Sequence, residues 1–224
     1  MVHSYRMTPL PLFPLPMAAC PRELVPLHVF EERYKQMIRF CRDQQEQGGA
    51  GEFIIAYFGQ QLVAVGTVVR LVKVLRTYDD GRLDVVVVGR RRCRIAEVES
   101  GMAYRMARPE PMVDTKEDWN ELLATEAFNL HRSLIQVVTG QTPAESRYAG
   151  VTELSFLLAA TLGLGHGIKQ ELLELTDEDQ RLHLLIREMS TLMHHVEQVQ
   201  TAARAIQGHW ELEKIYGHHP TSRS

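Results

Sequence analysis

The sequence is poor in features that mark several common classes of protein. Its 224 residues include only three cysteines, Cys20, Cys41 and Cys93, and no C-x-x-C pair. This pattern excludes a disulfide framework and a zinc ribbon, and it indicates free thiols that pack as small hydrophobic side chains. No apolar run approaches the ~20 residues of a membrane-spanning helix, and the proline-rich N-terminus lacks the apolar core of a signal peptide. We therefore expect a cytoplasmic protein without a membrane partner.

Motifs of catalysis and metal binding are missing as well. The sequence contains no G-x-x-x-x-G-K-[ST] phosphate loop, no G-x-S-x-G and no H-E-x-x-H. His194 and His195 are adjacent, so on a helix they point in different directions and cannot act as an i, i+4 ligand pair. We expect no cofactor, no metal site and no enzymatic activity.

Charge and hydrophobic pattern divide the chain into two halves. Residues 1–112 carry a net charge of +4 and residues 113–224 a net charge of −7, which together give −3. The first half is rich in Val, Ile, Leu and Tyr in strand-length runs, whereas the second repeats apolar residues at helical spacing. We predict an α+β fold, with a β-rich subdomain over residues 7–112, an all-helical bundle over residues 113–208 and a flexible tail over residues 209–224.

The first half is expected to form a closed or nearly closed sheet. The proline-broken run at residues 10–15 predicts an edge strand, because proline cannot donate to an interior ladder. The run Val85–Val88 is typical of a strand buried on both faces, Gly66 of a bulge or bend, and Asp80-Gly81 of a tight hairpin turn. The other expected strands are Leu24–Phe30, Phe53–Phe58, Leu62–Tyr78, Leu83–Val88, Arg92–Val98 and Tyr104–Met112.

One helix is expected in the first half and several in the second. An apolar stripe predicts a helix that covers one end of the sheet, and its members are Tyr34, Met37, Ile38 and Cys41. In the second half, helical spacing predicts helices over residues 116–139, 153–162 and 168–175, followed by the longest helix of the chain.

Three segments of the second half have the pattern of helix N-termini. Asp114 or Thr115 is placed to cap the helix at 116–139, and Thr176 to cap the last helix. The segment Thr142-Pro143-Ala144-Glu145 has the pattern of a capping box with proline, which predicts a further helix start.

The last helix carries the most regular apolar pattern of the chain. Its apolar residues are spaced alternately by three and four positions, as in a coiled-coil seam. They are Leu182, Leu185, Met189, Leu192, Val196, Val199, Ala203 and Ile206. The seam can pack inside the protein's own bundle, or its part at Val196–Ile206 can pair with a second copy to form a homodimer.

Several ordered motifs resemble one known family. LPLFPL begins at Leu10, P-x-E-L-x-P-L at Pro21 and H-V-F-E-E-R-Y at His28. Later matches are GTVVRL at 66–71, DGRL at 80–83, GRRRCRI at 89–95 with Cys93 where an aromatic residue is usual, and KQELLE at 169–174 followed by RL at 181–182. In this order the motifs resemble the Lon substrate-binding domain, the N-terminal domain of Lon proteases, over roughly residues 7–200.

The resemblance implies a PUA-like pseudo-barrel followed by a helical bundle, and a function in binding proteins or peptides without catalysis. The expected partners are unfolded or flexible protein segments, and a separate ATPase or protease remains open. Such segments could bind in an apolar groove between the two halves, or add as a strand to an exposed sheet edge. The linker Pro109–Asp114 could let the groove vary in width. The candidate peptide-binding residues are Leu12, Phe13, Leu27, Phe30 and Tyr34.

A run of arginines gives an alternative function. On a strand, Arg90, Arg92 and Arg94 would point to one face and could contact the phosphates of RNA or a nucleotide. The competing interpretation is a set of structural ion pairs, with Glu31, Glu32 or Asp84 as partners. The acidic balance of the chain argues against nucleic acid as the main partner.

Overall fold

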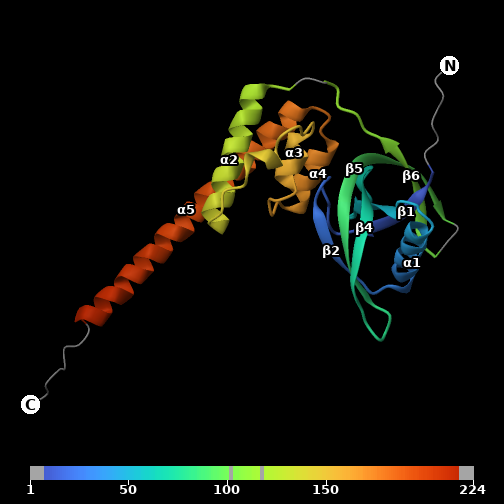
Figure 1. The fold of residues 1–224 in the computed structure, drawn as a ribbon, viewed down its shortest axis with the longest axis horizontal. Helices are drawn as coiled ribbons and strands as arrows, with labels where there is room; N and C mark the ends of the chain where they lie inside the picture. The colour runs from blue at the N-terminus through green and yellow to red at the C-terminus, as the bar shows by residue number, and fades with distance from the viewer. Residues whose placement is uncertain (1–7, 101–102, 117–118, 217–224) are drawn as a thin grey trace, which may run out of the picture.

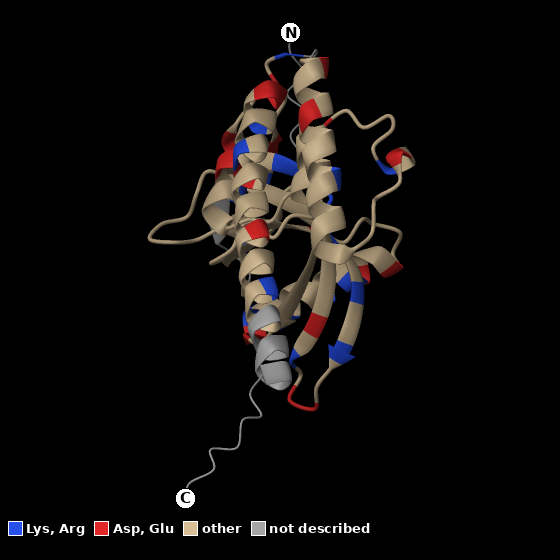
Figure 2. Ribbon diagram, turned by 90° about the vertical axis from the view of Figure 1, so that its left-hand side faces the viewer, with Lys and Arg blue, Asp and Glu red and all other residues tan. Residues whose placement is uncertain are grey.

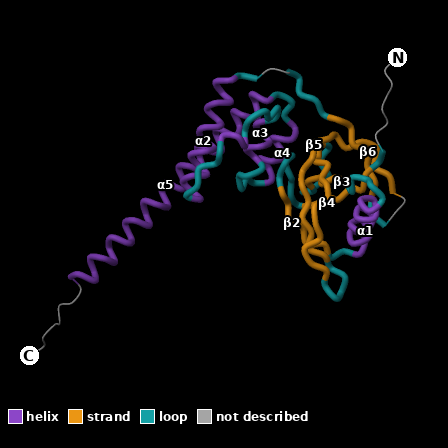
Figure 3. The backbone as a smooth tube through the Cα atoms, viewed as in Figure 1, coloured by secondary structure: helices purple, strands orange, loops and turns teal. Residues whose placement is uncertain are grey.

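The computed structural model describes residues 8–100, 103–116 and 119–216. A six-stranded sheet is followed by a group of helices, so the predicted α+β fold is confirmed (Figures 1 and 3). The elements of the first half are β1 Leu10–Leu15, β2 Leu24–Val29, α1 Glu32–Glu46, β3 Glu52–Tyr57, β4 Val65–Thr77, β5 Leu83–Ser100 and β6 Arg105–Pro111. Those of the second half are α2 Glu121–Thr139, a 3-10 turn at Glu145–Arg147, α3 Leu154–Ala159, α4 His166–Glu174 and α5 Glu178–Tyr216.

The sheet closes on itself because β5 is long. The strand order is β2-β5-β4-β3-β1-β6, with an additional pairing of β5 with β6. The first part of β5 pairs with β2 and β4, and its second part, from Cys93 onward, pairs with β6. The strands β1, β3, β4, β5 and β6 therefore form a ring, and β2 is attached to the outside of that ring.

The prediction that residues 10–15 form an edge strand is wrong. β1 pairs in parallel with β3 and antiparallel with β6. The two ladders overlap only at Leu12, because β6 pairs with Leu10–Leu12 and β3 with Leu12–Leu15. Pro11 and Pro14 therefore each face one partner strand and not two, and the chain tolerates their missing donors.

Two finer expectations about the strands are also wrong. Val85 and Val87 are buried but Val86 and Val88 are only half-buried, so this part of β5 alternates and is not buried on both faces. Gly66 lies in regular pairing, and a Cβ there would come within 2.6 Å of the Ile55 carbonyl oxygen, so the glycine permits a close approach of two backbones.

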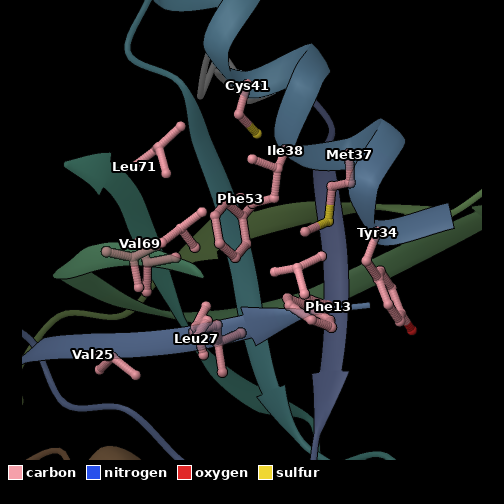
Figure 4. Packing of buried hydrophobic residues seen from close by; sticks show 14 of the residues in the cluster. Phe13, Val25, Leu27, Tyr34, Met37, Ile38, Cys41, Phe53, Val69 and Leu71 are labelled. Atoms are coloured by element: carbon pink, nitrogen blue, oxygen red, sulfur yellow. The ribbon is translucent and has the colours of Figure 1, made fainter. Parts of the chain in front are cut away.

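The predicted apolar stripe of α1 is confirmed, and it packs on a face of the sheet in one core cluster with residues of β1 to β5. Met37 and Ile38 point into the sheet beside Phe53, as Figure 4 shows. Tyr34 stacks on Phe13, with ring centroids 4.1 Å apart. The predicted hairpin is also present, since β4 ends and β5 begins around Gly81, whose φ is 79°.

The helix starts of the second half differ from those expected. α2 is capped by Asn120, whose side chain accepts from the backbone N–H groups of two following residues, and not by Asp114 or Thr115. The expected capping box yields only the short 3-10 turn Glu145–Arg147.

The last helix, α5, is capped by Asp177 and not by Thr176. Asp177 Oδ1 accepts from the N–H of Asp179 at 3.0 Å and from the N–H of Gln180 at 3.4 Å. α5 continues to Tyr216 through part of the expected tail, and residues 217–224 lie outside the described chain.

Buried charges join the sheet to the helices. Arg181 is fully buried, and its guanidinium donates to Asp114 Oδ1 at 2.8 Å and to the Leu175 carbonyl at 2.8 Å. Arg92 of β5, also buried, pairs with the same Asp114. Asp114 therefore links a strand to the last helix, and these ion pairs hold the end of the linker Pro109–Asp114, which was expected to let the groove vary in width.

We expect Arg181→Met to lower the free energy of unfolding by about 3–5 kcal/mol, because it leaves the buried carboxylate of Glu178 without its arginine and Asp114 with only one. Urea denaturation followed by circular dichroism measures this loss. The control is Arg187→Met, which removes an exposed arginine paired with Glu188 and should change stability by no more than about 0.5 kcal/mol. Equal stability of the two variants would contradict the structural role of the buried charges.

Candidate functional site

An open groove of about 500 Å³ lies where the sheet meets the start of α1 and the tip of α4. We call it the apolar groove. One wall is formed by residues 13–17 at the end of β1, and the facing wall by residues 26–31 of β2 and the turn after it. Tyr34 of α1 and His166 of α4 complete the lining. The groove thus lies between the sheet and a helix of the second half.

The structure brings four of the five candidate peptide-binding residues to this groove. Phe13, Leu27 and Tyr34 belong to the core and expose only a small edge of their side chains. Phe30 is 61% exposed and lies at the rim. Leu12 does not join them, because its side chain is fully buried in a separate core cluster behind β1.

The sequence analysis missed several lining residues. Met17 and Pro16 follow β1, and no period or motif marked them as part of a wall. His166 follows a Gly-rich break, and only the packing of α4 brings it to the groove. Pro26 could have been found, because the alternation of buried and exposed residues along β2 puts it beside the exposed Leu24 and Phe30.

A polar cluster borders the groove beside Phe30. His28 Nδ1 lies 2.6 Å from Asp84 Oδ1, and the Tyr78 hydroxyl donates to Asp84 Oδ2 at 2.7 Å. The hydrogen bonds with His28 and Tyr78 hold the pKa of Asp84 below its ordinary value. Asp84 is therefore occupied by a histidine and a tyrosine, and it is not the ion-pair partner that the arginines were expected to have.

A second, more polar depression of about 490 Å³ lies on the other side of Tyr34 and Pro14. Arg33 and Arg105 contribute its positive groups and Glu31 a negative one. Arg33 is already paired with Glu31 at 2.7 Å and lies over the ring of Tyr34. Half of the positive charge of this depression is thus neutralised within the protein.

The three arginines of the alternative function do not form one face. A register shift in the pairing with β4 falls at Arg90, which changes the side-chain alternation beyond it. Arg90 and Arg94 are exposed, but Arg92 is 3% exposed and bound to Asp114 and the Leu173 carbonyl. Arg91, which was expected on the opposite face, pairs with Glu52. In the view of Figure 2, positive and negative residues are interspersed over the ribbon.

The cysteine thiols and the possible metal ligands of the described residues were compared with what reactive sites require. Burial raises the pKa of Cys20, Cys41 and Cys93 to about 12, so their thiols stay protonated at neutral pH. In the part of the chain that the structure describes, no three His, Cys, Asp or Glu side chains gather as a metal site requires. None of the described helices has the length and apolar character of a bilayer span.

Comparisons with known proteins agree with this α+β fold. The N-terminal domain of a Lon protease of the Mycobacterium avium complex superposes with a TM-score of 0.62 at 21% identity, covering 82% of this chain and 98% of that one. A Lon N-terminal domain protein from Xanthomonas campestris gives a TM-score of 0.55 at 27% identity, covering 81% of this chain and 98% of that one. A comparison with curated proteins finds no match. A family model of the substrate-binding domain of ATP-dependent protease La (Lon) matches residues 9–191, and the chain belongs to that family.

Proposed function

We propose that the protein is a non-catalytic binding module that holds exposed apolar segments of unfolded or flexible protein chains in the apolar groove. The observation that carries the proposal is a pair of exposed apolar side chains, one at the start of β2 and one directly after it. Leu24 and Phe30 are 64% and 61% exposed, and Phe30 lies on a groove large enough for several side chains. Membership of a substrate-binding family supports protein chains as the ligand.

The groove is suited to this role because its floor is rigid. Phe13, Leu27 and Tyr34 are held by the core of the first half, so they lose no freedom when a ligand arrives. Burying a side chain such as that of Phe30 against a ligand contributes about 1.5–3 kcal/mol. Affinity then comes from apolar contact, and a folded protein with its apolar side chains buried would not compete.

The remaining partner expectations follow from the same proposal. A module without a catalytic group would act by presenting its client to a separate ATPase or protease. The free, buried thiols of Cys20, Cys41 and Cys93 suit the reducing cytoplasm. The RNA alternative is not favoured, because Arg92 is buried in an ion pair and only Arg90 and Arg94 remain exposed.

We expect Phe30→Ser to weaken binding of an unfolded protein by about 1 kcal/mol, or roughly fivefold in Kd, since it removes the exposed aromatic ring at the rim. The probe is reduced, carboxymethylated α-lactalbumin with a fluorescent label, and binding is measured by anisotropy. The control is Val138→Ser, which changes an equally exposed apolar residue, also 61% exposed, on α2. Native α-lactalbumin should not bind.

Unchanged binding of the probe by Phe30→Ser would remove the groove as the site. Equally strong binding of native α-lactalbumin would contradict the preference for unfolded chains. An equal loss in both variants would indicate a general effect of surface hydrophobicity and would contradict the assignment in the same way.

We also propose that α5 pairs with a second copy of the chain. Leu182, Leu185 and Met189 are buried in the bundle, so this part of the seam packs within its own chain. Further along, Val199 and Ile206 of the same seam are 68% and 59% exposed, where α5 extends away from the rest of the protein (Figure 1). A second α5 would cover these residues.

Sedimentation velocity should therefore show a concentration-dependent dimer, which Val199→Glu dissociates because it places a charge in the seam. Gln198→Glu adds the same charge at an exposed neighbouring position outside the seam and should leave the dimer intact. A monomer at all concentrations would exclude the pairing.

A further inference from the structure

β2 has a free edge along the apolar groove. It is the terminal strand of the sheet order, and among the described strands its ladder is with β5. Residues 26–31 line the groove, so there is open space beside the strand. α4 contacts the residue before β2, where Lys169 Nζ lies 2.5 Å from Glu23 Oε1, and its first residue, His166, lines the groove.

The hydrogen-bonding pattern shows which backbone groups face this edge. The N–H of Gly89 in β5 donates to the Glu23 carbonyl at 2.9 Å. Antiparallel strands bond to each other at every second residue, so Val25, Leu27 and Val29 face β5, whereas Leu24, Pro26 and His28 turn their backbone groups to the open side. The position of Pro26 agrees, because a proline that faced β5 would break the ladder.

Proteins usually protect such an edge, and this one is poorly protected. Common devices are lysines, prolines and bulges along the free strand. β2 has no lysine, and Pro26 removes one donor but keeps its carbonyl as an acceptor. His28 keeps both its N–H and its carbonyl. The side chains that flank these groups, those of Leu24 and Phe30, are apolar and exposed.

We propose that an extended segment of the client binds to the free edge of β2 as an added strand. This rests on the proposed function and defines its client: a segment that can be extended and that alternates apolar side chains. The backbone groups of Leu24, Pro26 and His28 would bond to the segment. Its side chains on one face would enter the groove opposite Leu15 and Met17, which are partly buried there.

An extended segment fits better than a helix for a physical reason. The backbone of a helix is already hydrogen-bonded internally, so it cannot satisfy the free groups of β2. A strand satisfies them and also presents every second side chain to the groove. Selection of unfolded clients follows, because a folded chain has its backbone groups paired elsewhere.

The first arm of the test uses a fluorescent synthetic peptide of alternating valine and threonine, with terminal lysines for solubility and one central phenylalanine that fixes its register. A series of peptides carries a single backbone N-methyl group at successive positions. N-methylation should weaken binding by about tenfold at every second residue and little at the residues between, because only alternate N–H groups face β2. A uniform or absent effect along the series would overturn strand addition.

The second arm compares His28→Pro with His28→Ala in the full chain. Both variants lose the contact of the imidazole with Asp84, but only His28→Pro loses the N–H at the free edge. We expect His28→Pro to bind the unmodified peptide about tenfold more weakly than His28→Ala. Thermal unfolding of both variants checks that they fold, and the N-methyl series decides alone if His28→Pro does not.

The outcomes separate this inference from the proposed function. Equal binding by both His28 variants, with no alternation in the N-methyl series, would overturn strand addition even where Phe30→Ser still weakens binding. If Phe30→Ser and the N-methyl groups all leave binding unchanged, the apolar groove is not the site, and both proposals fail.

Discussion

The buried ion cluster of Arg92, Asp114, Arg181 and Glu178 is the constraint on which the arrangement of the two halves depends. Burial lowers the pKa of Arg92, and the neighbouring Arg181 lowers it further. Burial also opposes the charge of Arg181, but hydrogen bonds and charges from Asp114 and Glu178 outweigh it and raise the pKa of that arginine. These charges are tolerated only while all four side chains remain together. The sheet and the last helix are therefore fixed relative to each other, and His166 is held on the groove opposite the end of β1.

The apolar groove exists because the ring of strands closes without β2. β5 is 18 residues long, and it pairs with β2, β4 and β6 at different points along its length. Closure pairs large parts of the other strands on both sides, which reduces the risk of uncontrolled association. β2 is the terminal strand of the sheet order, and its free edge lies beside a groove whose floor is part of the core. The same closure thus stabilises the first half and leaves the edge of β2 open beside the groove.

The sequence was sufficient where local pattern decides the structure, and insufficient where distant partners do. The stripe of α1 and the turn at Gly81 depend on nearby residues, and both were predicted. Asp114 has the chemistry of a helix cap, but two buried arginines bind it instead, and Asn120 takes the cap. The prediction that the three arginines point to one face was wrong for a related reason. The register shift at Arg90 arises from pairing with β4, and the alternation of residues in the sequence does not reveal it. Among the residues that line the apolar groove, Phe30 could be predicted from its apolar character. The position of His166 on the groove could not, because it depends on how α4 packs.

A site for unfolded clients, as proposed for the apolar groove, has to accept many sequences, and strand addition would allow this. Backbone hydrogen bonds are the same for every client, so strand addition tolerates sequence variation, while the groove favours apolar side chains at alternate positions. Each contact of this type is weak, and a client would leave quickly from a single site. Pairing through α5 would change this balance. At ~1.5 Å per residue the 39 residues of α5 span about 58 Å, so a dimer would present two grooves to one unfolded chain. The second binding event would then be intramolecular, and an unfolded client long enough to reach both grooves would bind more tightly than a short peptide.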